Sequence, residues 1–293
     1  MFKTILTHMT GTDCDQQVLT TALQIARSFS GHLECLRVMA DPTSLAMQAA
    51  QPDLVTSSML AEALNFLEQQ NREGTQRARI TLAEFCKQED VPFANEPSGS
   101  NGVSAHWREK TGDEFDELTS QGRSHDLVVL AGGVERKGRL PPEGIGQIII
   151  GSGRPVLLAA QKPRKSITRT IAIAWKNTPE AARAVSAAMP LLSKAERIEV
   201  LSANEEDTKA IECLNCSDTI VQQLRWHGLN AYGHFVVPAG RTIPNAILET
   251  ARGFNADLLV MGGYGHSRLR EFIFGGFTRR ILDGVDLPVL VFH

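Results

Sequence analysis

The feature that most restricts the fold of this chain is an internal repeat. Three strand-like segments of the first half recur in the same order in the second half. The matched pairs are residues 3–12 with 169–178, residues 126–132 with 257–263, and residues 154–158 with 287–291. Such matches indicate a duplicated domain, and 293 residues are comfortable for two domains. We therefore expect one domain over 1–162 and another over 168–293, joined by the polar and basic segment 161–168.

Strand-like and helix-like patterns alternate along each half. In the first half we expect strands at 4–7, 33–38, 93–95, 126–130 and 155–159, and helices at 15–29, 59–89 and 114–120. In the second half we expect strands at 170–174, 198–201, 231–236, 258–261 and 289–292, and helices at 179–192, 213–227, 243–253 and 277–283. This alternation predicts an α/β fold in which each domain holds a parallel five-stranded sheet flanked by helices. In such sheets, ligands bind beyond the carboxyl ends of the strands.

A glycine-rich loop follows the strand predicted at 258–261. Gly262 and Gly265 come directly after this strand, and Gly275 stands just before the helix predicted at 277–283. Glycine lets a backbone approach a ligand closely, and free N–H groups at a helix start attract phosphate. The order strand, glycine loop and helix therefore indicates a nucleotide phosphate site, although strand-to-helix turns in any α/β fold also use glycine.

Two better-known nucleotide motifs are absent. No Gly-x-x-x-x-Gly-Lys-Ser/Thr run occurs, so the loop is not a P-loop. Gly263-x-Gly265 continues to Arg268 where a dinucleotide fingerprint needs a third glycine, so hydride chemistry has no support.

Composition excludes several functional classes. The net charge of −3 gives no electrostatic case for nucleic acid or an anionic membrane, and no apolar run reaches transmembrane length. Residues 1–6 read as a strand and not as a signal peptide, so we expect a cytoplasmic protein. Five scattered cysteines argue against a disulfide framework. The lone Cys213-x-x-Cys216 lacks a second pair of ligands, so packing is a better interpretation than metal or redox work.

These residues together resemble the universal stress protein family in its tandem two-domain form. Nucleotide-binding members carry Gly-x2-Gly-x9-Gly-Ser/Thr after the fourth strand, and Gly262, Gly265 and Gly275 stand at that spacing. The resemblance spans nearly the whole chain and is strongest at 175–192 and 257–292. It implies Rossmann-like domains of the adenine nucleotide alpha hydrolase type, ATP or another adenine nucleotide with or without Mg²⁺, dimerisation, and a stress-response role.

By this resemblance the second domain binds the nucleotide. Trp175 and Ala203 line the adenine, and Met261 and Gly262 approach the adenosine. The residues assigned to the phosphate loop are Gly265, His266, Ser267, Gly275, Gly276, Phe277 and Thr278. His266 reads equally as a phosphate donor or as a solvated loop residue. Four arginines surround the loop, namely Arg268, Arg270, Arg279 and Arg280. They are interpreted either as phosphate-binding side chains or as side chains that face solvent or another subunit.

The sequence departs from the family at two positions of this site. Gly276 stands where the family has Ser or Thr, so one hydroxyl donor is missing, and Thr278 is the nearest replacement. Lys176 replaces the family's acidic residue at the end of the first strand, which affects the adenine and ribose contacts.

The first domain departs much further. The four loop glycines at 262, 265, 275 and 276 align with Ala131, Val134, Pro142 and Glu143, and the acidic strand-one position is Thr10. Proline lacks an N–H donor, and glutamate adds negative charge where phosphate would sit. We therefore expect the first domain not to bind nucleotide in the family manner. We expect segment 144–153 to be a structural turn, with a loop of other use as the alternative.

The preferred function is nucleotide sensing and not catalysis. No general base, nucleophile or metal set is legible, so slow ATP hydrolysis is the most that we expect. Three alternatives stay open: a scaffold with vestigial sites, a nucleotide-dependent enzyme, and a binder of another small ligand in the first domain.

Overall fold

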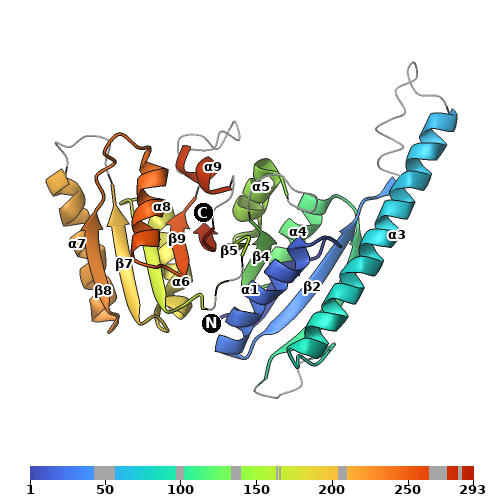
Figure 1. Ribbon diagram of the computed structural model, residues 1–293, viewed down its shortest axis with the longest axis horizontal. Coiled ribbons are helices and arrows are strands. Elements are labelled where there is room, and N and C mark those ends of the chain that lie inside the picture. The colour runs from blue at the N-terminus through green and yellow to red at the C-terminus, as the bar shows by residue number, and fades with distance from the viewer. Residues whose placement is uncertain are drawn as a thin grey trace.

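A computed structural model describes residues 1–42, 57–96, 102–132, 140–162, 164, 166–203, 210–263, 276–282 and 286–293. The described strands form one ten-stranded sheet in the order β3-β2-β1-β4-β5-β10-β9-β6-β7-β8 (Figure 1). Their bounds are β1 Thr4–His8, β2 His32–Met39, β3 Ser104–Thr111, β4 Leu127–Ala131, β5 Val156–Ala159, β6 Thr170–Ala174, β7 Arg197–Ser202, β8 Ala231–Phe235, β9 Leu258–Gly262 and β10 Val289–Phe292.

The sheet repeats the duplication seen in the sequence. The first five strands are all parallel, in the order β3-β2-β1-β4-β5, and the last five repeat this order as β8-β7-β6-β9-β10. The two halves meet where β5 and β10 pair antiparallel, with Leu157 opposite Leu290. The predicted α/β fold with two parallel five-stranded units is therefore confirmed, and the seam makes one continuous sheet of both.

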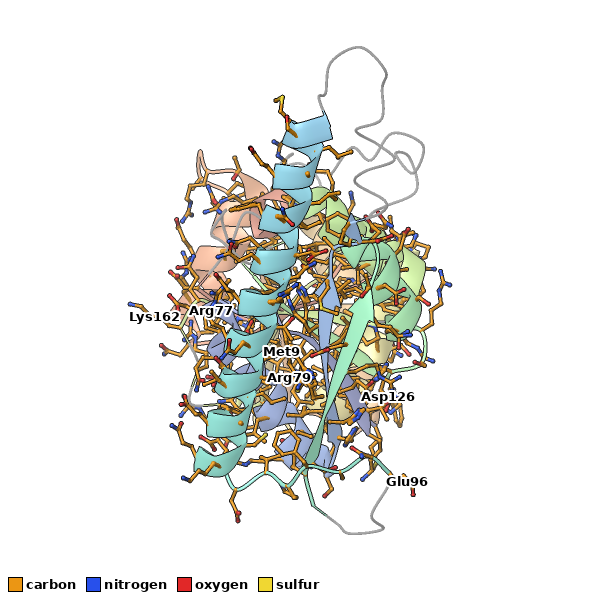
Figure 2. All side chains as sticks on the ribbon, turned by 90° about the vertical axis from the view of Figure 1, so that its right-hand side faces the viewer. Met9, Arg77, Arg79, Glu96, Asp126 and Lys162 are labelled. Carbon is orange, nitrogen blue, oxygen red and sulfur yellow. The ribbon has the colours of Figure 1, made fainter. Side chains whose placement is uncertain are left out.

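Helices cover both faces of the sheet (Figure 1). One core cluster lies between the sheet and the helices α1 Cys14–Phe29, α3 Ser57–Gln88, α6 Pro179–Leu192 and α7 Ala210–Trp226. The other cluster includes buried residues of α4 Glu114–Gly122, α5 Pro142–Ser152, α8 Ile243–Gly253 and α9 Gly276–Leu282. Neighbouring strand residues alternate between the clusters, as Ile5 and Leu6 of β1 do, because successive side chains point to opposite faces. Figure 2 shows α3 running along the length of the first half.

The strand predicted at 93–95 is wrong. Phe93 forms only an isolated bridge to Ala105 and is 54% exposed, and the third strand is β3. Of the β3 residues only Ala105 is buried, so the strand lacks the apolar run that marks a central strand. An edge strand tolerates such polar residues because it has one neighbour and is open to water.

The turn predicted at 144–153 is also wrong, because this stretch belongs to α5. A Cβ on Gly144 would lie 2.1 Å from Cε1 of Phe115, and a Cβ on Gly151 would lie 2.7 Å from Cγ2 of Thr119. Phe115 and Thr119 belong to α4. These glycines therefore allow α4 and α5 to pack closely, a role that the sequence alone does not distinguish from a turn.

Candidate functional site

The ends of β6 and β7 carry two buried polar atoms that have no partner in the described structure. The N–H of Trp175 donates to Leu201 O at 2.8 Å, which continues the parallel ladder beyond the Ala174–Leu201 pair and sets Trp175 opposite Ser202. Nε1 of Trp175 and Oγ of Ser202 are both buried, and neither has a hydrogen-bond partner among the residues that the structure describes. Buried polar groups are nearly always hydrogen-bonded, so each exception calls for an explanation such as a ligand.

The end of β9 lies next to this pair, since β9 neighbours β6 in the sheet. Met261 is buried, and Gly262 is the last residue of the strand. A Cβ on Gly262 would lie 2.6 Å from Ala181 N and 2.7 Å from Glu180 C. Gly262 is therefore required by the close packing of β9 on the start of α6, whatever its part in ligand binding.

The turn between β6 and α6 carries Lys176 and Thr178. Lys176 is exposed. Thr178 caps the helix, because its hydroxyl accepts from Ala181 N at 3.4 Å. Ala203 lies beyond β7, half-buried against the other core cluster.

The phosphate loop is described in part. Gly276 begins α9, Thr278 is buried, and Arg279 is exposed. Nε of Arg280 donates to Asn245 Oδ1 of α8 at 3.0 Å, so this arginine holds two helices together. Other predictions for the loop lie outside the described residues or side chains and stay predictions, namely those on Gly265, His266, Ser267, Arg268, Arg270, Gly275 and Phe277. The same holds for the side chains of Cys213 and Cys216 on α7.

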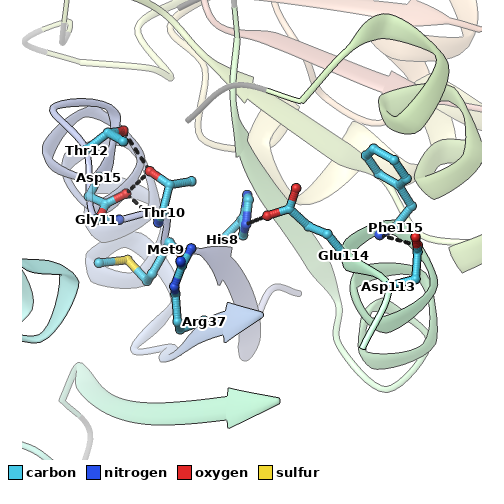
Figure 3. Close-up of polar contacts among 10 residues, drawn as sticks. All are labelled: His8, Met9, Thr10, Gly11, Thr12, Asp15, Arg37, Asp113, Glu114 and Phe115. Atoms are coloured by element: carbon cyan, nitrogen blue, oxygen red, sulfur yellow. Dashed lines mark hydrogen bonds and ion pairs between the residues drawn. The ribbon is translucent and has the colours of Figure 1, made fainter. Parts of the chain in front are cut away.

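The first half fills the same edge of its sheet with charged side chains (Figure 3). His8, at the end of β1, is 2% exposed, and its Nε2 donates to Glu114 Oε1 at 3.0 Å. Burial alone would raise the pKa of Glu114, but the hydrogen bond and charge of His8 and the charge of Arg37 outweigh it and lower that pKa. Arg37 lies near the end of β2, and burial lowers the pKa of its guanidinium.

The turn after β1 is closed on itself. The carboxylate of the fully buried Asp15 accepts hydrogen bonds from Thr10 N, Thr10 Oγ1 and Gly11 N, each at 2.8 Å. Gly11 has φ +75°, and a Cβ there would lie 2.2 Å from Gly74 O of α3. Nε of Arg77 also donates to Gly11 O at 3.0 Å, so α3 is fixed against this turn.

Comparison with known proteins decides the family. The sequence profile of the Universal stress protein family matches residues 168–293. Residues 168–293 therefore form a domain of the universal stress protein family. Universal stress protein Slr1230 of Synechocystis is 24% identical over 310 residues and covers 99% of this chain and 100% of that one, so the similarity extends over both halves.

Solved structures show the same tandem fold. A universal stress protein from Archaeoglobus fulgidus matches with a TM-score of 0.67 at 15% identity, over 99% of this chain and 97% of that one. A functionally unknown protein from Pseudomonas aeruginosa PAO1 matches with a TM-score of 0.55 at 16% identity, over 99% and 92%. In the part of the chain that the structure describes, no helix is long and apolar enough to cross a membrane.

Four residues that the sequence assigns to the nucleotide site are described, and all lie at or just beyond the carboxyl ends of β6, β7 and β9, namely Trp175, Ala203, Met261 and Gly262. Sequence reasoning missed Ser202, whose hydroxyl has no partner among the described residues. The sequence did offer one signal for Ser202. It is a serine at the end of an apolar strand, directly before the predicted site residue Ala203. Nothing in the sequence indicated that the Trp175 indole N–H is buried without a partner.

Proposed function

We propose that the second half of the chain, its universal stress protein domain, binds an adenine nucleotide at the carboxyl edge of β6, β7 and β9. The observation that carries the proposal is the pair of unpartnered buried atoms, Trp175 Nε1 and Ser202 Oγ. A buried polar group without a hydrogen bond costs about 1–3 kcal/mol. A purine and its ribose offer both acceptors and donors, so a bound nucleoside would offset this cost at both atoms.

The Trp175–Ser202 pair also suggests which side chain replaces the acidic residue that the family carries at the position of Lys176. Lys176 occupies the family's acidic position and is exposed. The Ser202 hydroxyl lies one strand away and is buried. In this proposal, Ser202 makes the polar contact that the acidic side chain makes elsewhere in the family. The spacing of Gly262, Gly265 and Gly275 lets the backbone approach the phosphates.

The proposed role is sensing in a cytoplasmic stress response. A nucleotide that binds the folded state stabilises it by mass action, and this couples nucleotide concentration to the population of folded and partner-competent protein. In this account residues 1–162 and 168–293 act as the two domains, and two chains associate further as a dimer. Mg²⁺ would supply charge neutralisation on the phosphates if it accompanies the nucleotide.

One member of the family is solved in complex with cAMP. That protein aligns with 44% of this chain at a TM-score of 0.34, so its ligand is a property of that protein, and the proposal rests on the side chains of this one.

The test is the variant Ser202→Ala, because it has two effects of opposite sign. Without ligand it should stabilise the protein by about 1 kcal/mol, since it removes a desolvated hydroxyl. With ligand it should weaken ATP binding about fivefold to tenfold, since it removes a hydrogen bond. Ser193→Ala is the control, because this exposed hydroxyl bonds only its own helix at Pro190 O. Urea unfolding and calorimetry measure the two effects, and unchanged ATP affinity in Ser202→Ala would overturn the assignment.

A scaffold with vestigial sites is the second candidate. Gly262 favours this candidate, because the close packing of β9 on α6 alone explains why a glycine stands at this position. This candidate predicts that millimolar ATP, ADP and AMP all fail to bind, while partner proteins still do.

A further inference from the structure

Arg37 of the first half forms no direct ion pair with the carboxylates that the structure describes. Arg37 is half-buried near the end of β2, and its Nη1 donates to Met9 O at 3.4 Å. Its Nε is buried without a hydrogen-bond partner among the residues described. Within that same part of the chain, no carboxylate lies within 4.0 Å of its guanidinium. A charge held out of water without a partner is costly, so the site is built for something that pairs with it.

Every charged group that acts on Arg37 is already engaged. Glu114 accepts from His8, and Asp15 is held by the turn at Thr10 and Gly11. Arg77 pairs with Glu73 at 3.5 Å and bonds Gly11 O. The fourth group, Glu109, accepts from both Arg79 and Trp107. The Nε–H donor of the Arg37 guanidinium is therefore available to an acceptor that is not among the described residues.

The position of Arg37 is where a ligand would bind in this fold. β1 has β2 on one side and β4 on the other, so the carboxyl end of β1 is the point at which the strand order reverses. Figure 3 shows the Arg37 guanidinium between the Thr10–Asp15 turn and the His8–Glu114 pair. Glu114 keeps 38% of its side chain exposed, so water reaches the His8–Glu114 side of Arg37.

The internal repeat adds a second, independent observation. Glu34 of β2 pairs with Leu6, and Glu199 of β7 pairs with Ala172, which is the equivalent of Leu6 in the other half. Arg37 and Ser202 each lie three residues beyond these glutamates. In both halves, the same place in the fold thus carries a buried polar atom without a partner among the described residues, Nε of Arg37 in one and Oγ of Ser202 in the other.

The surrounding charge selects the class of ligand. A carboxylate matches the planar fork of a guanidinium and adds one negative charge. Glu114 and Asp15 already act electrostatically on Arg37, so they repel each further negative charge on a ligand. A phosphate dianion or a nucleotide polyphosphate therefore fits less well than a monoanion.

We propose that the first half binds a small monocarboxylate, whose carboxyl group pairs with Arg37 at the carboxyl end of β1. The proposal is independent of nucleotide binding, because it concerns the other half of the sheet.

The test is an NMR titration of the full-length protein with sodium propionate, following the Nε–H signals of its arginines against a sodium chloride reference. Propionamide is the neutral isostere, and inorganic phosphate is the dianion. We expect a saturable shift with propionate and none with propionamide. Arg37→Gln should weaken the binding about tenfold or more, because a charge-assisted pair is lost.

Two further variants keep the result interpretable. Arg72→Gln removes a cation of α3 that is 80% exposed and pairs with Glu68, so it should leave the affinity unchanged within about twofold. Glu114→Gln removes a competing negative charge and should tighten the binding about threefold. Equal affinity in wild type and Arg37→Gln, tighter binding of phosphate than of propionate, or competition by ATP would each overturn the proposal.

Discussion

Arg37 of β2 and Ser202 of β7 occupy equivalent positions in the two halves of the sheet, and each ends in a buried polar atom without a partner in the described structure. Both lie at the carboxyl edge, where open α/β sheets bind ligands. The duplication therefore places a buried polar atom at the same position of both halves, the hydroxyl of Ser202 in one and the guanidinium Nε of Arg37 in the other.

Gly262→Ala should destabilise the second half. The added methyl would meet the backbone of Ala181 and Glu180 at under 3 Å, and backbone cannot move aside as a flexible side chain can. We expect a loss of about 1–3 kcal/mol in the free energy of unfolding, as for other overpacked sites. Gly253→Ala is the control, because a Cβ there meets nothing within 4 Å and alanine favours the helix by about 0.5–1 kcal/mol. Equal stability of the two variants in urea would contradict the tight β9–α6 contact.

Gly144→Ala should disrupt the α4–α5 contact in the first half. The new Cβ would overlap the Phe115 ring at 2.1 Å, and the expected loss is about 1–3 kcal/mol. Truncating the ring makes room, so Gly144→Ala combined with Phe115→Leu should be less destabilised than the sum of the single variants. Additive losses in chemical denaturation would show that the two side chains do not meet.

The Glu114–His8 pair should make stability depend on pH in the acid range. The folded-state pKa of Glu114 lies below its ordinary value of 4.5, so the unfolded state binds more protons as the pH falls. Its contribution is fully present above about pH 4.5 and is lost as the pH falls through the lower folded-state pKa. Glu114→Gln should therefore flatten the acid limb of a plot of unfolding free energy against pH. Parallel acid limbs for the two proteins would exclude this role.

Glu199 should be a strong determinant of stability in the second half. It is fully buried between Arg197 and His234, and His234 Nε2 donates to Glu199 Oε2 at 2.6 Å. Glu199→Ala removes the acceptor that these two partly exposed side chains share and should cost about 1–3 kcal/mol. Glu199→Gln keeps an acceptor and should cost less. Denaturant midpoints of the two variants measure these losses of stability. Equal losses for Glu199→Ala and Glu199→Gln would contradict the prediction.

Much of the fold could be predicted from the sequence because central strands carry unbroken apolar runs. Helices α6 and α8 and strand β10 lie at the predicted residues. Strand β3 could not be found in this way, because an edge strand buries only Ala105 and otherwise carries polar residues. Helix α5 was read as a turn, because its glycines serve packing against Phe115 and Thr119.

The candidate site was predictable only where a motif or a strand end marks it. Trp175, Ala203, Met261 and Gly262 follow from the repeat and from the family resemblance. The roles of Ser202 and Arg37 depend on what surrounds a polar atom in three dimensions, and one sequence does not contain that information. The predictions for Gly265, His266, Ser267 and Gly275 stay predictions.

The most direct measurement of the central claim is a calorimetric titration of the full-length protein with ATP, with Gly265→Val beside it. The account predicts one nucleotide per chain, lost in the variant, because only the second half keeps the glycine spacing and the Trp175–Ser202 pair. No binding at millimolar ATP would contradict the proposed function. Two nucleotides per chain would contradict the division of chemistry between the halves.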